Sequence, residues 1–389
     1  MTAAERLAKA LSFTEADRVP LDLSGTTVSA FSKYAFASAM QYKNWPVKYY
    51  SQSVDPIQQI VIPEEEILDR LKIDSYRVGA RRIMNFEGKV QDYDTYHSII
   101  DPYQCEWRMK KEGDLYFNQA TYPYQNYETV SEALDDFSIY DIQEYRDVLA
   151  ADVDEQLTHK GDRGLIIDRN CAGLTEMSLR LRGYDTWFVD TMIDPEGVKS
   201  LLDLLVDHKI AYWEMLAKIL REKGVIDQVQ VVAEADDLGT QNSLLLSPDA
   251  LEDIVMPRVR RLIEFLKKQF PRAKTFFHTD GAVKQIIPDL MEAGVDILNP
   301  VQYSAEGMDL AELKKEFGKE LVFWGGGIDT QEILNKAKPA QVRDEVKKNI
   351  EILAPGGGFV FTTVHNIQAD VPPENFWAMW ESVMEYGKY

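Results

Sequence analysis

Cysteine and long apolar segments are both scarce in this sequence. The 389 residues include only two cysteines, Cys105 and Cys171, which provide no disulfide framework and suit a reducing compartment. No run of about eighteen apolar residues occurs, so no membrane-spanning segment is expected. The first residues, 1–6, lack the apolar stretch of a secretion signal. These absences predict a cytoplasmic protein.

An excess of positive charge is also missing. The chain carries 43 lysines and arginines against 64 acidic residues, a net charge of −21. Such a surface repels phosphate backbones and anionic lipids, which argues against nucleic acids and membranes as partners. With 45% hydrophobic and 28% charged residues, the chain is expected to bury a sizeable core. Its length allows one large domain or two average ones.

Eight short apolar segments bounded by turn residues are predicted to be buried strands. They span residues 19–25, 74–79, 164–169, 229–234, 274–278, 295–299, 321–324 and 358–364. Helical patterns follow at 248–269, 283–293, 310–317 and 339–353. In the last of these, the apolar residues Val342, Val346, Ile350 and Leu353 fall on one helical face.

Regular alternation of strand and helix predicts parallel strands with helical crossovers. Eight such units close into a (β/α)8 TIM-type barrel. The competing open sheet usually carries a glycine-rich turn after its first strand, whereas residues 23–28 contain only Gly25. We therefore predict a single barrel over residues 1–389. An insertion at about 80–160 is expected to hold a β-hairpin, 104–109 with 115–120, and an acidic helical stretch, 131–159.

Function in such a barrel is expected at the carboxyl ends of the strands. His278 and Asp280 follow the fifth predicted strand, His365 follows the eighth, and Glu234 ends the fourth. Histidine and carboxylate meeting at one mouth can bind zinc with a position left open for substrate. The alternative is that the histidines are simply hydrogen-bonded and that Asp280-Gly281 is ordinary turn chemistry.

Further candidates lie on the same loops. Asp236 and Asp237 are adjacent carboxylates that would raise each other's pKa, so Asp237 or Glu234 is a candidate general acid or base; a solvated loop is the alternative. Other residues would bind substrate, by amide hydrogen bonds or by lining an aromatic pocket, unless the aromatic ones belong to the core. These are Asn299, Gln302, Asn366, Gln368, Tyr303 and Trp324.

Five segments together resemble the uroporphyrinogen decarboxylase superfamily. They are residues 236–241, 278–281, 293–302, 323–330 and 365–375, and the resemblance is strongest from residue 229 onward. True uroporphyrinogen decarboxylases hold the carboxylates of a porphyrinogen with arginines in the loop after the first strand. Residues 23–33 contain no arginine here, so decarboxylation of a porphyrinogen is not expected.

The second branch of the superfamily consists of zinc-dependent methyltransferases that work with corrinoid proteins. Members acting on coenzyme M use a His-x-Cys pair after the fifth strand and a cysteine after the eighth. In this chain Asp280 and His365 stand at the two thiolate positions. Oxygen and nitrogen ligands leave zinc a stronger Lewis acid than thiolates do, which suits a methyl ether better than a thiol.

The resemblance therefore implies a zinc-dependent O-demethylase component. The metal ligands would be His278, Asp280 and His365, with Glu234 as a fourth ligand or base. The methyl group of a methoxyaromatic donor would pass to Co(I) of a partner corrinoid protein, because no cobalamin-binding motif is recognisable in this chain. The alternatives are a decarboxylase, a methyltransferase for methylated thiols or amines, and a non-catalytic binding barrel. The methyl donor stays open, as does assembly into a homodimer.

Overall fold

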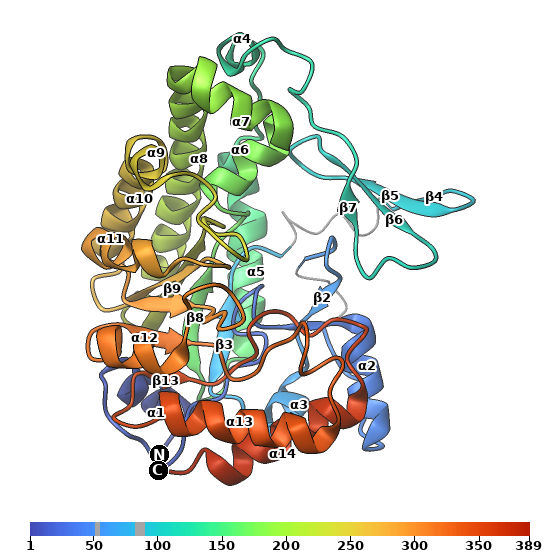
Figure 1. Ribbon diagram of the computed structural model, residues 1–389, viewed down its shortest axis with the longest axis vertical. Helices are drawn as coiled ribbons and strands as arrows, with labels where there is room; N and C mark the ends of the chain where they lie inside the picture. Colours follow the sequence, from blue (N-terminus) through green and yellow to red (C-terminus); the bar gives the residue numbers. More distant parts are fainter. Residues whose placement is uncertain (51–54, 82–89) are drawn as a thin grey trace.

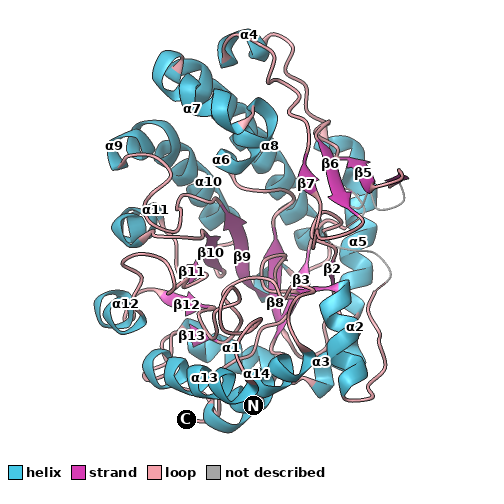
Figure 2. Ribbon diagram, turned by 45° about the vertical axis from the view of Figure 1, so that its right-hand side comes forward, coloured by secondary structure: helices cyan, strands magenta, loops and turns pink. Residues whose placement is uncertain are grey.

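A computed structural model describes residues 1–50, 55–81 and 90–389 of the chain. Helices surround a central group of strands, and a small antiparallel sheet projects from this body (Figures 1 and 2). Among the described residues, no helix has both the length and the apolar character needed to cross a membrane.

The central strands form a parallel sheet that curls into a barrel. Seven strands are hydrogen-bonded in the order β13-β12-β11-β10-β9-β8-β3 within the described part of the chain. Their bounds are Phe359–Val360 (β13), Val322–Trp324 (β12), Ile297–Asn299 (β11), Lys274–His278 (β10), Val229–Ala235 (β9), Gly164–Asp168 (β8) and Ser75–Val78 (β3). Seven of the eight predicted strands are therefore present, and the predicted (β/α)8 fold is confirmed.

The eighth position is irregular. The predicted strand at 19–25 forms only an isolated parallel bridge, Leu21 with Phe361. Its backbone still joins both edges of the sheet, since Asp22 N donates to Phe361 O and Asp74 N donates to Leu21 O, each at 2.9 Å. Pro20 has no N–H group to extend a ladder, which explains why this segment closes the barrel without becoming a regular strand.

Helices surround the barrel (Figure 2). In α13, Pro339–Leu353, the predicted stripe of Val342, Val346, Ile350 and Leu353 is buried. The other long helices are α1 (Ala3–Leu11), α2 (Lys33–Tyr42), α5 (Arg146–Thr158), α6 (Leu174–Arg182), α7 (Tyr184–Ile193), α8 (Pro195–Glu222), α10 (Met256–Gln269), α12 (Leu310–Phe317) and α14 (Pro373–Tyr386). The short ones are α3 (Glu65–Arg70), α4 (Val130–Leu134), α9 (Pro248–Ala250) and α11 (Ile287–Ala293). Of these helices, α4 and α7 lie beyond the end of the barrel (Figure 2).

The inserted region contains more strand than the sequence predicted. The predicted hairpin is present as β6, Glu106–Lys110, with β7, Asn118–Gln119, but β6 also pairs with β5, Tyr96–Ile100. Together with β4, Gln91–Asp92, they form a four-stranded antiparallel sheet. The predicted acidic helix is divided into α4 and α5. Residues 82–89 of the predicted insertion lie outside the described residues.

The barrel interior is filled by side chains that alternate along the strands. Val231 and Ala233 of β9 pack inside with Phe276 and Trp324, and α1 contributes Leu7 to the same cluster. Trp324 is fully buried and its Nε1 donates to Asp22 Oδ2 at 2.7 Å. The prediction that Trp324 lines a substrate pocket is therefore wrong, because its ring fills the barrel core.

Candidate metal centre and active site

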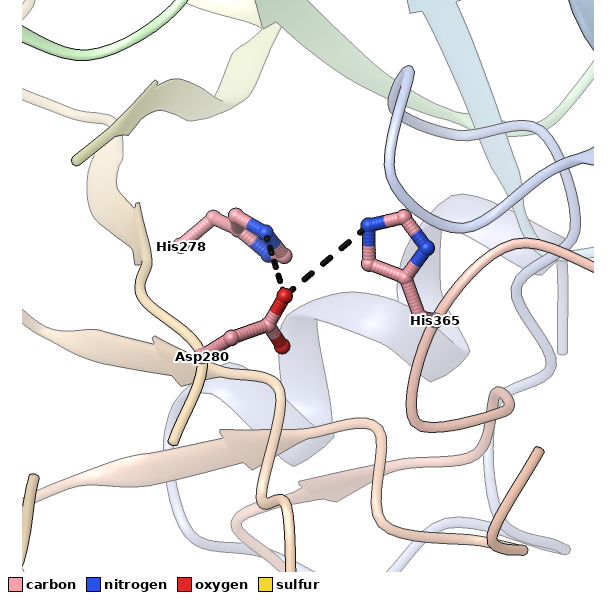
Figure 3. Close-up of side chains that lie close together, drawn as sticks. All are labelled: His278, Asp280 and His365. Atoms are coloured by element: carbon pink, nitrogen blue, oxygen red, sulfur yellow. Dashed lines mark ion pairs between the residues drawn. The ribbon is translucent and has the colours of Figure 1, made fainter. Parts of the chain in front are cut away.

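Two imidazoles and one carboxylate meet at the carboxyl end of the barrel. His278 is the last residue of β10, Asp280 lies two residues further on, and His365 arrives after β13. The Oδ2 atom of Asp280 lies 3.6 Å from His278 Nε2 and 4.0 Å from His365 Nε2 (Figure 3). The candidate ligand atoms of all three lie within 4.8 Å of one another. The structure thus brings together three of the four residues that the sequence nominated as metal ligands.

The orientation of His278 suits a metal ligand. Its Nδ1 lies 2.7 Å from the Oδ1 atom of Asn299, and the amide nitrogen of Asn299 donates to Trp324 O at 2.7 Å. Because that second bond fixes which end of the amide faces the imidazole, His278 carries its proton on Nδ1. Its Nε2 lone pair is then directed to Asp280 and His365. Such a partner on the far nitrogen accompanies most metal-binding histidines.

Both imidazoles are neutral at neutral pH. Burial lowers the pKa of His278 to about 4, and the nearby His365 and Arg169 lower it further against the opposing effect of Asp280. Burial, followed by the charge of Arg169, likewise lowers the pKa of His365 to about 4. Neutral imidazole is the form that binds a metal ion.

The spacing of the three groups is close to that required by zinc. Ligand atoms ~2.0–2.1 Å from a tetrahedral ion lie about 3.3 Å from each other. The two distances to Asp280, 3.6 and 4.0 Å, need only a small contraction to reach this value. Nitrogen and oxygen donors at this spacing fit Zn²⁺ and leave a position for substrate.

A second carboxylate lies beside the centre. Asp237 Oδ1 is 3.8 Å from His278 Nε2 and has no hydrogen-bond partner among the described residues. Burial, with the charges of Glu176, Asp280 and Asp236, raises the pKa of Asp237 well above its usual value. A carboxyl group in this setting can hold a proton close to the metal position.

The neighbouring Asp236 has a different task. Its carboxylate accepts hydrogen bonds from the backbone N–H of Thr175, at 2.9 Å, and of Glu176, at 3.2 Å, at the start of α6. Asp236 is fully buried there. Of the two adjacent aspartates, therefore, only Asp237 faces the centre.

Glu234 does not join the cluster, and its assignment as a metal ligand or base is corrected. Its Oε2 accepts from Lys209 Nζ at 2.8 Å, and its Oε1 accepts from Trp213 Nε1 at 2.5 Å. Both partners lie on α8. Ala233 points into the barrel, and successive residues of a strand point to opposite sides. Glu234 therefore faces the helix layer.

The other nominated residues fall into two groups. Gln302, Asn366 and Gln368 line an outer depression of about 760 Å³ at the mouth. Asn299 and Tyr303 line neither this depression nor the pocket beneath it. Asn299 orients His278, and the Tyr303 hydroxyl accepts a hydrogen bond from Asp329 N at 2.7 Å. The prediction that Asn299 and Tyr303 bind substrate directly is therefore corrected.

An inner pocket of about 150 Å³ lies beside the centre. His365 and Arg180 line both this pocket and the outer depression, so the cluster stands between them. The apolar part of the inner wall is aliphatic, formed by Val28, Pro56, Ile57, Ala80 and Ala172. Among the described residues, aromatic side chains line the outer depression instead, namely Trp107, Tyr116 and Phe117.

Sequence reasoning missed three arginines that line the inner pocket. They are Arg77, Arg169 and Arg180. Arg169 directly follows β8, so the strand-end rule that nominated His278 could have found it. Arg77 lies within β3, a buried strand in which no sequence signal marks the direction of a side chain.

A barrel with a polar centre at its carboxyl end is the architecture of many enzymes. A family model described as uroporphyrinogen decarboxylase (URO-D) matches residues 172–386, and the chain belongs to this family. This confirms the resemblance seen in the sequence.

Individual relatives are more distant. A uroporphyrinogen decarboxylase of Legionella pneumophila (strain Lens) is 26% identical over 189 residues, 48% of this chain and 51% of the relative. One of Psychromonas ingrahamii is 25% identical over 187 residues, 47% of this chain and 46% of the relative. The chain thus spans about half the length of these relatives. A solved methyltransferase from Methanosarcina mazei has the same fold, with a TM-score of 0.64, 16% identity and 99% coverage of both chains.

Replacing Asn299 with alanine tests how the centre is oriented. The change removes the acceptor for His278 Nδ1. We expect the dissociation constant for Zn²⁺, measured by competition with a chelating dye, to rise about 10- to 100-fold. Asn118→Ala, at an exposed position of β7, is the matched control and should bind zinc as the wild type does. Unchanged affinity in a folded Asn299→Ala protein would show that the amide does not support the metal ligand.

Proposed function

We propose that this protein is a zinc-dependent methyltransferase that cleaves a methyl ether, with a methoxyaromatic donor, and passes the methyl group to Co(I) of a corrinoid protein. The observation that carries this proposal is the cluster of His278, Asp280 and His365 at the mouth of the barrel. Membership of the uroporphyrinogen decarboxylase family and the shared fold with a methyltransferase support it.

The ligand types favour an ether over a thiol as the group to be demethylated. Zn²⁺ bound by His278, Asp280 and His365 would supply a Lewis acid for the ether oxygen. None of the three nominated ligands is a thiolate, and nitrogen and oxygen donors neutralise less of the metal's charge. A weakly basic ether oxygen needs this stronger polarisation before its bond to the methyl carbon can break.

Asp237 is placed to complete the reaction. When the methyl–oxygen bond breaks, its electron pair remains on oxygen, and the methyl carbon accepts a new pair from Co(I). Asp237, whose Oδ1 lies 3.8 Å from His278 Nε2, is placed to deliver the proton that this oxygen then takes up. The products are the phenol and the methylated corrinoid, and Asp237 is reprotonated from solvent.

The two cavities suggest where the reactants bind. The donor would occupy the inner pocket, with its ether oxygen at His278 and His365. The corrinoid partner would approach from the outer depression, which His365 and Asp280 also line. The methyl group would then cross from one cavity to the other at the cluster itself.

The experiment compares zinc-loaded protein with chelator-treated protein in the methylation of Co(I) cobalamin, followed by visible absorbance. Methoxyaromatics, methylated thiols and methylated amines serve as donors, and CO2 release without cobalamin is measured in parallel. We expect zinc-dependent methylation from methoxyaromatics alone. A full rate from metal-free protein would contradict the proposal.

Decarboxylation of a small acid is the alternative that the family name suggests. The volume of the inner pocket argues against a porphyrinogen as the substrate. A cavity of about 150 Å³ holds a single ring such as benzene. Release of CO2 in the same assay, without methylation of cobalamin, would select this alternative. Absence of both reactions, with no bound metal, would indicate a non-catalytic binding barrel.

A further inference from the structure

We propose that the inner pocket contains an anion subsite, in which Arg169 and Arg77 bind a carboxylate carried by the methyl donor. The identification of the ligand as the methyl donor rests on the proposed function. The subsite itself rests on the contacts of the two guanidinium groups.

Arg169 has unused hydrogen-bonding capacity at the pocket wall. Its side chain is only 9% exposed, and its Nη1 has no hydrogen-bond partner among the described residues. The carboxylate of Asp168 lies 3.7 Å from this nitrogen, which is beyond hydrogen-bonding distance. A buried guanidinium nitrogen without an acceptor is costly, so a ligand that supplies one is favoured.

Arg77 lines the same pocket and has a second buried nitrogen without a hydrogen-bond partner among the described residues. This nitrogen is Nη1, and the side chain is 2% exposed. Its Nε donates to Asp168 Oδ2 at 2.7 Å, and its Nη2 donates to Ala80 O at 3.3 Å. The single carboxylate of Asp168 therefore lies next to two guanidinium groups.

Asp168 is itself fully engaged. Besides Arg77, it accepts hydrogen bonds from the backbone N–H of Thr27, at 3.1 Å, and of Arg169, at 3.0 Å. Its fully buried side chain cannot turn toward Arg169 without losing these bonds. The Nη1 donor of Arg169 thus remains for a ligand to fill.

The other carboxylates of the pocket form hydrogen bonds with other groups, although the charges of Asp55 and Glu176 also act on Arg169. Glu176 accepts from Arg180 Nη2 at 3.2 Å and from Gly173 N at 3.1 Å. Asp55 accepts from the backbone N–H of Ile57 at 2.9 Å within its own turn. Asp237 faces the metal position. Among the described residues, none of these carboxylates accepts a hydrogen bond from Nη1 of Arg169 or from Nη1 of Arg77.

The size of the pocket narrows the class of ligand. About 150 Å³ between aliphatic walls accommodates one aromatic ring. Arginine matches the planar geometry of a carboxylate better than that of any neutral group. Since His278, His365 and both arginines line the same pocket, the donor would be a monocyclic methoxyaromatic acid that contacts both sets of residues.

The test measures binding of the three methoxybenzoate isomers and the corresponding neutral methoxybenzamides to zinc-loaded protein by calorimetry. We expect at least one acid to bind wild-type protein about 10- to 100-fold more tightly than its amide, as expected for hydrogen bonds to a charged group. Arg169→Gln should abolish this preference and leave amide binding unchanged. Arg169→Lys, which keeps the charge but not the planar fork, should retain part of it.

Arg272→Gln is the matched control, because the Arg272 side chain is 70% exposed and lies outside the residues that line the pocket. It should preserve the acid preference in full, and thermal unfolding confirms that every variant is folded. Equal binding of acid and amide by the wild type, or no binding of any acid, would overturn the subsite even if neutral ethers methylate cobalamin. An Arg169-dependent acid preference without any methyl transfer would leave the subsite standing and overturn the proposed function.

Discussion

Replacing His365 with alanine is expected to lower zinc affinity and methyl transfer by more than two orders of magnitude while leaving the fold intact. The change reduces three nominated ligands to two, a greater loss than the ~10–100-fold effect of an outer hydrogen-bond partner. The fold should survive because the His365 side chain is 29% exposed and its ion pair with Asp280 is long, at 4.0 Å. Elemental analysis and the cobalamin assay measure the two losses.

His159→Ala provides the matched control for that experiment. His159 lies at the end of α5, where its side chain is 35% exposed and 3.6 Å from Glu65. It lines neither the inner pocket nor the outer depression. This variant should retain both zinc and activity. Full zinc content and full rate in folded His365→Ala protein would remove His365 from the metal centre and with it the basis of the proposed mechanism.

Replacing Glu234 with glutamine is expected to destabilise the protein without removing its metal. Lys209 and Glu234 are 1% and 0% exposed, and their atoms lie 2.8 Å apart. Removing one partner of a buried ion pair leaves an uncompensated charge and costs about 3–5 kcal/mol. Urea unfolding followed by tryptophan fluorescence should show this fall in the free energy of unfolding, while zinc content stays unchanged.

A double variant separates the lost pair from the lost side chain. Lys209→Met with Glu234→Leu removes both charges from the interface between β9 and α8, and such apolar replacement of a buried pair is often neutral. We therefore expect the double variant to recover most of the stability that Glu234→Gln loses. Loss of zinc from Glu234→Gln with normal stability would restore Glu234 as a metal ligand.

The strand-end rule located the candidate centre from sequence because it needs only the position where each strand ends. His278, Asp280 and His365 follow β10 and β13, and their meeting requires only that parallel strands close into a barrel. The same rule failed for Glu234 because strands buried on both faces show no alternation of polar and apolar residues. Without that alternation, the sequence does not indicate whether Glu234 points inward or outward.

Two other differences have specific causes. Trp324 was nominated for a pocket from its place at a strand end, but the fit of its ring beside Phe276, at 5.7 Å, depends on tertiary packing. The inner pocket combines residues from 27–28, 55–58 and 169–180 with the centre near residue 278. Such a combination of distant loops has no local sequence pattern, so the arginines could be recognised as one subsite only in three dimensions.

The irregular segment that closes the barrel has a consequence for the centre. A continuous path of hydrogen bonds leads from His278 through Asn299 to Trp324, and from the Trp324 indole to Asp22. Asp22 belongs to the stretch whose backbone joins the two edges of the sheet, next to β13 and β3. The irregular segment that closes the barrel is therefore connected by hydrogen bonds to the imidazole at its mouth. A ligand that immobilises His278 should therefore stabilise the closed barrel at this segment. Local opening of the segment should in turn lower the affinity for that ligand, by the same coupling free energy.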